Sequence, residues 1–349
     1  MSVQRKKTIL VTGGAGFIGS HFVELAIGTG RRVVVLDAFT YAGHRENLEH
    51  IPESDDYHLI HGDIRDAELL SKLFQKHRVD EIINLAAETH VDRSIEDAAL
   101  FLHTNVVGTF NLLRTALSCW ESLDEAGREA FRFVQVSTDE VFGSLGSAGK
   151  FDERSPVQPR SPYSASKAGA DHLVSAWHST YGLPVITTHC SNNYGPRQHP
   201  EKLIPHMITQ ALEGRPLPVY GDGRNVRDWI HVEDHCRGLI LALERGVPGH
   251  RYCFGGGEEW ANIDLVKLIC GELDRLHPRS DGRRHEEGIE FVKDRLGHDR
   301  RYAIDDSLAR RELGFSCSHE FRDGIAATVK WYVENQGWCT KVLSKGGSA

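Results

Sequence analysis

The sequence has no hydrophobic run long enough to cross a membrane, and its cysteines lack the spacing of a disulfide or metal framework. No segment approaches the roughly 18 consecutive apolar residues of a membrane span, and the short apolar run 9–11 ends at glycines, which does not fit a signal peptide. The seven cysteines are odd in number, scattered and never in a CxxC pair. They predict buried thiols in a reducing, cytoplasmic environment.

An excess of positive charge is also missing. The 41 Lys and Arg residues against 49 Asp and Glu residues give a net charge of -8, which argues against a nucleic acid or an anionic membrane as partner. We expect no metal site among the 20 histidines. With 349 residues and 40% hydrophobic content, the chain can bury a large core, and we expect it to act on a small molecule.

Apolar runs alternate with helical segments along the first half of the chain. TILVTGG, RRVVVLDAF, DYHLIHGDI, EIINLAAE, FRFVQVSTDE and LPVITTHCSN each end in small or polar residues and suit strands that are covered on both faces. Helical spacing appears between them, as in DAELLSKLFQKH and in residues 98–120. The alternation predicts an α/β fold with a Rossmann-like, doubly wound parallel sheet.

The pattern changes after about residue 196, where short segments rich in glycine and charge are mixed with helices. We therefore predict a first domain over residues 1–196 that binds the cofactor and carries the catalytic residues. Residues 197–349 are expected to form a smaller, intertwined lobe, mainly for the substrate, with some chain returning to the first domain. Such a lobe would cover the carboxyl ends of the strands, where open α/β sheets bind ligands.

A glycine motif predicts a dinucleotide site. Gly13, Gly16 and Gly19 lie between an expected strand and an expected helix, where they allow a tight turn close to a pyrophosphate. Asp37 follows about 20 residues later and is placed to bind an adenosine ribose. An aspartate there favours NAD over NADP, although Arg31 and Arg32 could reach a 2′-phosphate unless they are ordinary solvent-facing charges. Asp63 either caps a helix or contacts the adenine.

YSASK at 163–167 is a candidate catalytic motif, because it places Tyr163 and Lys167 on one face of a helix. The lysine charge can lower the pKa of the phenol, so that it acts as a base toward a sugar hydroxyl. A surface tyrosine and lysine on an ordinary helix is the simpler alternative. Together with the glycine motif, Asp37 and Thr138, the set resembles the extended short-chain dehydrogenase/reductase family, in which a Ser/Thr, Tyr and Lys triad would let Thr138 hold the substrate hydroxyl.

Asp139 and Glu140 stand side by side in STDEVFG, where a strand is expected to end. Adjacent side chains in a regular strand point to opposite faces, so both can serve one site only where the chain turns. One protonated and one ionised carboxyl can act as the acid and the base of a single elimination. The alternative is that Asp139 caps the next turn and Glu140 faces water.

Longer motifs extend the resemblance from residue 8 to about residue 332. STDEVFG, SPYSASKAGADHL, CSNNYGP, PEKLIP, VRDWIHVEDH, GHDRRYAID, LAAETHVDRSI and YAGHRENL are similar to segments of the nucleotide-sugar 4,6-dehydratases, and most of all to the dTDP-glucose 4,6-dehydratases. In that family NAD oxidises C4 of the hexose, water is lost across C5 and C6, and hydride returns to C6.

The resemblance implies residue roles. It makes Asp139 the acid for the C6 hydroxyl, Glu140 the base at C5, Tyr163 the base at the C4 hydroxyl and Lys167 its activator. The residues expected around a tightly bound NAD are Gly13, Gly16, Phe17, Ile18, Gly19, Asp37, Ala38, Phe39, Thr40, Asp63, Ile64, Leu85, Ala86, Ala87, Thr104, Tyr163, Lys167 and Asn193. Those expected around the nucleotide sugar are Glu88, Thr138, Asn192, Lys202, Leu203, Pro218, Tyr220, Arg227, Asn262, Asp294 and His298.

Three positions depart from the family pattern: Phe142 for Tyr, Thr89 for Ser and Leu296 for Pro. The nucleotide base and hexose stay open, with UDP-glucose or a UDP- or GDP-linked N-acetylglucosamine as alternatives to dTDP-glucose. The same fold could also serve an epimerase or a decarboxylating dehydrogenase and, more remotely, a non-catalytic scaffold. The family further implies a homodimer through helices over 100–120 and 163–181, with Leu112, Leu113, Leu117 and Trp177 as candidate contacts unless they are buried within one subunit.

Overall fold

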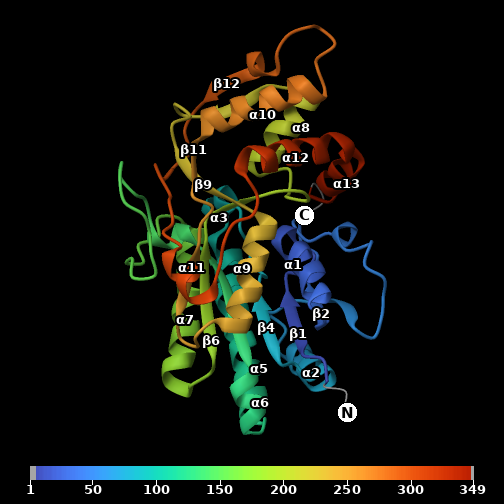
Figure 1. Ribbon diagram of the computed structural model, residues 1–349, viewed down its shortest axis with the longest axis vertical. Helices are drawn as coiled ribbons and strands as arrows, with labels where there is room; N and C mark the ends of the chain where they lie inside the picture. Colours follow the sequence, from blue (N-terminus) through green and yellow to red (C-terminus); the bar gives the residue numbers. More distant parts are fainter. Residues whose placement is uncertain (1–4, 347–349) are drawn as a thin grey trace.

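The centre of the protein is a sheet of seven parallel strands. The computed structural model describes residues 5–346. The strands are β1 (Thr8–Thr12), β2 (Arg32–Asp37), β3 (Tyr57–His61), β4 (Glu81–Asn84), β5 (Arg132–Thr138), β6 (Val185–Cys190) and β10 (Arg251–Phe254). Their order is β10-β6-β5-β4-β1-β2-β3, and every neighbouring pair is parallel. This confirms the predicted doubly wound, Rossmann-like α/β fold (Figure 1).

The winding of the chain reverses beside β1. Strands β2 and β3 extend the sheet on one side of β1, whereas β4, β5 and β6 extend it on the other. At the carboxyl end of β1, Thr12 is paired with Leu36 on one side and with Asn84 on the other. Such a switch point leaves a crevice outside the carboxyl ends of the strands, which is where these sheets bind ligands.

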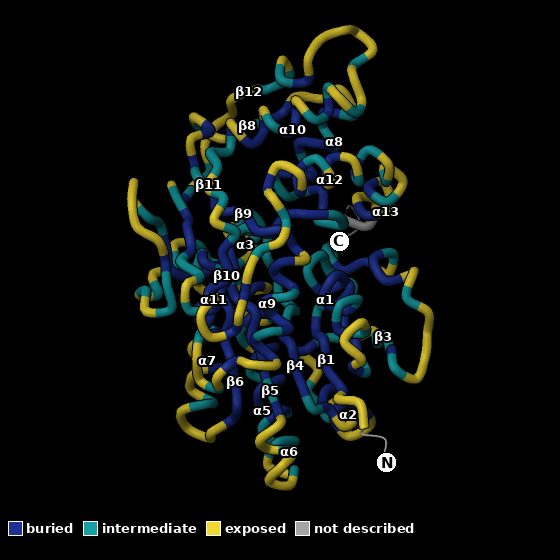
Figure 2. The backbone as a smooth tube through the Cα atoms, viewed as in Figure 1, coloured by how far each residue is buried: buried dark blue, intermediate teal, exposed yellow. Residues whose placement is uncertain are grey.

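Helices cover both faces of the sheet because successive strand residues point to opposite sides. Ile9 packs into a core with α1 (Phe17–Gly28), α9 (Val232–Arg245) and α11 (Ser307–Leu313). Leu10 packs on the opposite face with α2 (Ala67–His77), α5 (Thr109–Glu121) and α7 (Pro162–Tyr181). Figure 2 shows the resulting band of buried residues along the central strands. Within residues 5–346, no helix is both long and apolar enough to span a membrane.

A second lobe has its own core. Its helices are α8 (Leu203–Leu212), α10 (Asn262–Leu276), α12 (Phe321–Glu334) and α13 (Gln336–Gly346), with a short η4 (His285–Gly288). Its strands form two small sheets, in the order β11-β9-β7 and β12-β8: β7 (Asn192–Tyr194), β8 (Leu217–Tyr220), β9 (Val226–His231), β11 (Glu258–Ala261) and β12 (Ile289–Val292). Between these elements, α9, β10 and α11 join the central sheet and its helices. The division of the chain at residue 196 stays a prediction.

The helical segment expected over residues 98–120 has an irregular centre. It consists of α4 (Ala98–Phe101), a π-helical stretch η2 (Leu102–Gly108) and α5. Asn105 in η2 donates to the carbonyl of Glu88 and to Ser166, and accepts from the Glu88 N–H. The remaining short helices are η1 (Arg45–Asn47), α3 (Val91–Glu96), α6 (Glu125–Ala130) and η3 (Asp139–Phe142). The π-helical stretch thus fastens the loop after β4, which forms one wall of the pocket described next.

Candidate active site

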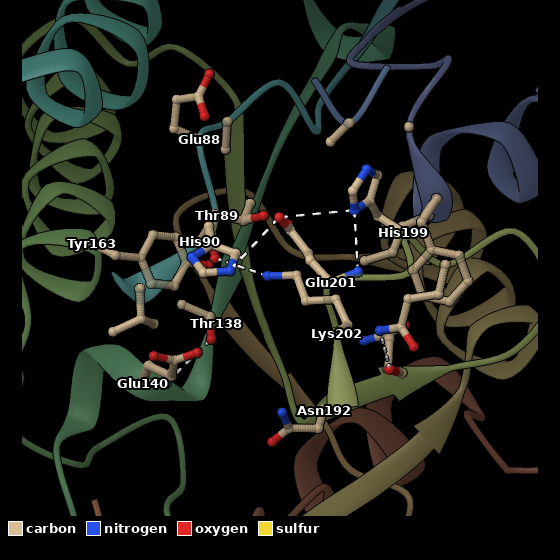
Figure 3. Close-up of a pocket in the computed structure, with 18 of the residues that line it drawn as sticks. Glu88, Thr89, His90, Thr138, Glu140, Tyr163, Asn192, His199, Glu201 and Lys202 are labelled. Carbon is tan, nitrogen blue, oxygen red and sulfur yellow. Dashed lines mark hydrogen bonds and ion pairs between the residues drawn. The ribbon is translucent and has the colours of Figure 1, made fainter. Parts of the chain in front are cut away.

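A cavity of about 760 Å³ lies between the carboxyl ends of the strands and the second lobe. Its volume is in the range of small-molecule and cofactor sites. Residues from both lobes line it, from Gly13 in the glycine loop to Tyr302 near the end of the chain. Figure 3 shows Thr138, Glu140 and Tyr163 on one side of this pocket, with the Lys202 side chain extending toward them from the other.

Two glycines of the loop, Gly13 and Gly19, lie too close to neighbouring backbone atoms to be replaced by a residue with a side chain. Gly13 has a φ of +69°, and a Cβ on it would lie 2.7 Å from the backbone nitrogen of Ala86. A Cβ on Gly19 would lie 2.1 Å from the carbonyl oxygen of Gly13. The loop therefore leaves its backbone open to the pocket at the start of α1, as the binding of a pyrophosphate at a helix N-terminus requires.

Asp37 closes β2 and holds the same loop. Its carboxylate accepts hydrogen bonds from the N–H groups of Ala15 at 2.9 Å and Phe39 at 2.8 Å. Burial raises the pKa of Asp37, and these two bonds oppose that shift. The carboxylate lines the pocket and can accept further bonds through its remaining lone pairs.

The two arginines considered for a 2′-phosphate lie outside the pocket. Arg31 is buried and bonds Glu81 at 2.7 Å, so the expectation of a solvent-facing charge is wrong for it. Arg32 contacts His58. Asp63 lines the pocket and accepts from the Arg65 guanidinium, whereas Asp66 is the residue that caps α2.

Strand β5 delivers the two neighbouring carboxyls. The strand ends at Thr138 and the chain turns at once into η3, so Asp139 and Glu140 both line the pocket. Thr138 accepts from the Glu140 N–H at 3.3 Å and its hydroxyl lies 3.4 Å from Asp139 Oδ1. Asp139 is only 2% exposed.

The two carboxyls have different electrostatic surroundings. Burial raises the pKa of Asp139 well above its ordinary value, and the charges of Glu140 and Asp228 add to this effect. Burial also raises the pKa of Glu140, but the positive charges of Lys202 and Arg227 oppose the shift. Asp139 therefore holds its proton more firmly than Glu140, a difference of the kind that separate acid and base roles require.

Helix α7 supplies the tyrosine and the lysine. Ser161 caps it in a capping box, which fixes Tyr163 in the first turn and Lys167 one turn later. Lys167 is buried and its ammonium donates to the carbonyl of Val136 at 2.7 Å. Burial lowers the pKa of Lys167, opposed by the nearby Asp171 carboxylate.

The surroundings of Tyr163 differ from the expected ones. Burial raises the pKa of Tyr163 well above its ordinary value, the charge of Glu140 adds to this, and a hydrogen bond with Thr138 acts in the opposite direction. In this structure the protein alone therefore favours the neutral phenol. The lysine charge predicted to lower the pKa is directed at the backbone of β5.

Two of the residues predicted around the substrate, Lys202 and Arg227, come from the second lobe. Arg227 is held by the carbonyls of Val226 and Asp299 and lies over the Tyr302 ring at 4.4 Å. Lys202 donates to the carbonyl of Thr89 at 3.1 Å. Burial lowers the pKa of Lys202, whereas the charges of Glu201 and Glu140 oppose this shift.

Nearly all predicted site residues line this one cavity. They are Gly13, Gly16, Phe17, Ile18, Gly19, Asp37, Ala38, Thr40, Asp63, Ile64, Leu85, Ala86, Ala87, Glu88, Thr104, Thr138, Asp139, Glu140, Tyr163, Lys167, Asn192, Asn193, Lys202, Leu203, Pro218, Tyr220, Arg227, Asn262 and His298. Phe39 and Asp294 are not among the lining residues. Phe39 instead stacks under Arg45 at 4.3 Å, and Asp294 bonds His298 at 2.6 Å.

Sequence reasoning missed several lining residues: His90, His199, Glu201, Arg295 and Tyr302. His90 and His199 lie 3.6 and 3.8 Å from the Glu201 carboxylate. Each of the five lies within or beside a motif that was recognised for other residues, such as PEKLIP or GHDRRYAID. Their place in the motifs was therefore the available signal.

The three departures occupy different environments. The Phe142 ring is buried against Phe151 and His189, with ring centroids 5.3 and 4.8 Å away, in a small core beside the pocket and not among its lining residues. Thr89 lines the pocket. Leu296 is 75% exposed and does not line it.

One group of possible metal ligands occurs in the described residues. Atoms of His231, Glu233 and His319 lie within 4.8 Å of one another. His231 already caps α9 by accepting from the Glu233 N–H, and His319 is bonded to Asp234 at 3.1 Å. The expectation that the protein has no metal stays a prediction.

Comparisons with known proteins agree on one group of enzymes. The model of the family described as GDP-mannose 4,6 dehydratase matches residues 10–328. The chain is 54% identical to a dTDP-glucose 4,6-dehydratase of Xanthomonas campestris pv. campestris (strain B100), over 96% of each chain. It is 51% identical to the enzyme of the same name from Neisseria meningitidis serogroup B, over 97% of this chain and 96% of the relative.

Solved structures resemble the protein along nearly its whole length. DesIV, a dTDP-glucose 4,6-dehydratase from Streptomyces venezuelae with NAD and TYD bound, superposes with a TM-score of 0.88 at 46% identity, covering 96% of this chain and 99% of that one. The UDP-glucose 4-epimerase of Thermotoga maritima has a TM-score of 0.82 but only 27% identity, over 94% and 99% of the two chains. The fold is thus shared more widely than the sequence.

Proposed function

This chain belongs to the nucleotide-sugar 4,6-dehydratase family of extended short-chain dehydrogenases/reductases, and we propose that it converts dTDP-glucose to dTDP-4-keto-6-deoxyglucose. The observation that carries this proposal is the meeting of Asp139 and Glu140 with Thr138, Tyr163 and Lys167 in one pocket. A 4-epimerase needs the triad but has no water to eliminate, so it has no use for the added acid and base.

The pocket fits NAD. Gly13 and Gly19 hold the loop in a turn that no side chain at either position would permit, and Asp37 lies at the end of β2, where an adenosine ribose would meet it. Asp37 would disfavour a 2′-phosphate, and neither Arg31 nor Arg32 lines the pocket. NAD, when bound, supplies a hydride acceptor for C4, a hydride donor for C6 and a positive charge that favours the Tyr163 phenolate.

Thr138, Tyr163 and Lys167 handle the first proton. Thr138 positions the C4 hydroxyl, and Tyr163 removes its proton as C4 becomes a carbonyl. Lys167, whose ammonium is held on the Val136 carbonyl, is the residue proposed to activate the tyrosine. The new carbonyl acidifies the proton at C5, which prepares the elimination.

Glu140 and Asp139 carry the elimination itself. Glu140 removes the C5 proton, and Asp139 donates its proton to the C6 hydroxyl, which leaves as water. After hydride has reached C6, Glu140, whose proton has exchanged with solvent, returns a proton to C5. Asp139 regains a proton from solvent and Tyr163 gives up the one it took, so both residues return to their starting forms. The raised pKa of Asp139 keeps that group protonated for its task, because burial and neighbouring negative charge disfavour its ionised form.

Arg227 and Lys202 supply positive charge toward the nucleotide sugar. The Arg227 guanidinium is fixed by two backbone carbonyls, and its planar set of donors suits a diphosphate. Of the two predicted residues outside the lining, Asp294 would act through the His298 that it bonds. Phe39 would shape the loop after β2 without contacting the cofactor.

Two properties of the whole protein belong to this proposal. We propose a homodimer that forms through η2, α5 and α7. Leu112 and Leu113 cannot contribute to it, because both are fully buried within the subunit, which corrects that part of the expectation. We also propose a cytoplasmic location, which suits seven cysteines that are all free thiols. Five of them are buried as expected, whereas Cys119 and Cys317 are only partly buried.

The decisive experiment supplies dTDP-glucose to the purified protein in D₂O. We expect the base-dependent ultraviolet absorbance of a 4-keto-6-deoxy sugar and one deuterium at C5 of the product. An epimerised sugar without deuterium at C5 would overturn the assigned reaction. Parallel assays with UDP-glucose and with UDP- and GDP-linked N-acetylglucosamine test the substrate, and turnover of one of these without turnover of dTDP-glucose would replace it.

A further inference from the structure

Helix α13 is linked to the glycine loop through the buried side chain of Asn47. Trp338 on α13 donates its indole N–H to the Asn47 side-chain oxygen at 2.9 Å. The amide nitrogen of Asn47 donates in turn to the carbonyl of Ala15, also at 2.9 Å. Ala15 lies inside the glycine loop, between Gly13 and Gly16. Trp338, 291 positions after Asn47 in the chain, is therefore linked through Asn47 to the loop expected to hold a pyrophosphate.

The neighbouring helix makes a second connection to the pocket. Tyr332 on α12 donates its hydroxyl to the carbonyl of Gln198 at 2.6 Å. Gln198 then donates its amide to the carbonyl of Asn193 at 3.0 Å, and both Gln198 and Asn193 line the cavity. Figure 1 shows α12 and α13 together in the second lobe. The helix pair is thus connected to the glycine loop through Asn47 and to a wall of the pocket through Gln198.

Asn47 is well suited to transmit the effect of the helix. It is 1% exposed, so its amide has no bulk water as an alternative partner. The backbone carbonyl of Asn47 also accepts a hydrogen bond from Arg197 at 3.1 Å, and Arg197 forms an ion pair with Glu24 of α1. Removing the indole donor leaves a buried amide oxygen without its bond, which frees the amide to turn and weakens its grip on Ala15.

From these contacts we propose that Trp338 and Asn47 are positioning residues for the cofactor, holding the glycine loop in the shape that retains NAD. The inference rests on the proposed function only in that NAD occupies this pocket. Neither residue lines the cavity, so both act through the Ala15 carbonyl and not on the reacting sugar. The loop tolerates little change of shape, because Gly13 and Gly19 already pack against backbone atoms.

The test uses Trp338→Phe in the full-length holoenzyme, which keeps an aromatic ring against Trp331 and Tyr332 but removes the N–H donor. We expect NAD to dissociate about tenfold faster, the effect of losing roughly one hydrogen bond to a buried group, measured by trapping released NAD with a dehydrogenase. Turnover should return to the wild-type value when NAD is added in excess. Asn47→Ala should act in the same direction, and the double variant should release NAD no faster than Asn47→Ala alone, because both remove one connection.

Trp331→Phe is the matched control. Its ring centroid lies 5.2 Å from that of Trp338, in the same aromatic cluster, but its indole is not part of the connection to Asn47. NAD release from this variant should stay at the wild-type rate even if its melting temperature falls. If Trp338→Phe lowers the melting temperature without speeding NAD release, the residue is structural only and the inference is overturned. If the wild-type protein neither retains nor binds NAD, the proposed function fails together with it.

Discussion

Glu140 is the residue on which the proposed reaction depends most directly. Its carboxylate lines the pocket between the positive charges of Lys202 and Arg227, which oppose the rise that burial causes in its pKa. Glu140→Gln keeps the size of the side chain but cannot accept the C5 proton. We expect turnover to fall by about 10²–10⁴, the usual contribution of a general base. The absorbance of reduced NAD should still appear on mixing with dTDP-glucose, because oxidation at C4 does not need Glu140; undiminished turnover would remove it from the role of base.

Asp139 should reveal its environment through the pH dependence of stability. Burial raises the pKa of its carboxyl in the folded state well above the ordinary value, so the folded protein binds this proton more strongly than the unfolded chain. As pH rises from the pKa of the unfolded state toward that of the folded state, the free energy of unfolding falls by about 1.4 kcal/mol for each pH unit. Asp139→Asn has no such proton to lose.

The melting temperature of Asp139→Asn should therefore rise relative to that of the wild type as pH increases from acid to neutral. Asp222→Asn is the control of opposite sign, because hydrogen bonds from Arg300 and from the Arg224 N–H lower the pKa of this exposed carboxyl. It should gain no stability over the same range. A constant difference between wild type and Asp139→Asn at every pH would show that the pKa of Asp139 is not raised.

At the scale of single elements, the strand ends were predictable and the contacts behind them were not. Thr138, Asp139 and Glu140 could be placed because a continuous apolar run ends at them, and Tyr163 and Lys167 because helical spacing aligns them. Phe142 could not be placed: whether the end of η3 faces the pocket or a small core depends on Phe151 and His189 from distant segments. The apolar pattern of 98–120 predicted a helix correctly but carried no sign of its π-helical centre.

That π-helical stretch gives a prediction for Asn105. Its amide satisfies the N–H and carbonyl of Glu88 and reaches Ser166 of α7. Asn105→Ala should lower the free energy of unfolding by about 1–3 kcal/mol for each buried backbone group left without a partner. Since Glu88 lines the pocket, the KM for dTDP-glucose should rise more than kcat falls. Asn111→Ala on α5 is the control, because it loses only a more exposed bond to the Arg65 carbonyl. It should change neither the free energy of unfolding, measured in urea, nor the KM, measured in steady-state assays, by a comparable amount.

At the scale of the molecule, the order of layers followed from the sequence, whereas the joining of the lobes did not. Alternating strands and helices predict a doubly wound sheet wherever they occur. No local pattern shows that α13 returns to the glycine loop, because the bond from Trp338 to Asn47 spans 291 positions. Nor does helical spacing distinguish a core leucine from an interface leucine; only the complete burial of Leu112 and Leu113 in the subunit places them in the core.

Exposed apolar residues on the helical layer formed by η2, α5 and α7 are better candidates for subunit contact. Leu102 is 51% exposed and Val107 is 42% exposed, and their spacing of five within a π-helical stretch places them roughly above one another. Tyr181 at the end of α7 is 49% exposed. Covering such apolar groups with another subunit stabilises the dimer. Leu102→Glu should therefore convert a dimer to a monomer in light-scattering measurements at micromolar concentration.

Phe291→Glu provides the matched control for that measurement. Phe291 is more exposed than Leu102, at 62%, but it lies on β12 in the second lobe, away from η2 and α7 (Figure 1). If apolar exposure alone drove association, this substitution would dissociate the protein as well. Retention of the dimer in Phe291→Glu and its loss in Leu102→Glu would locate the interface on the helical layer, whereas a wild-type monomer at micromolar concentration would refute the dimer itself.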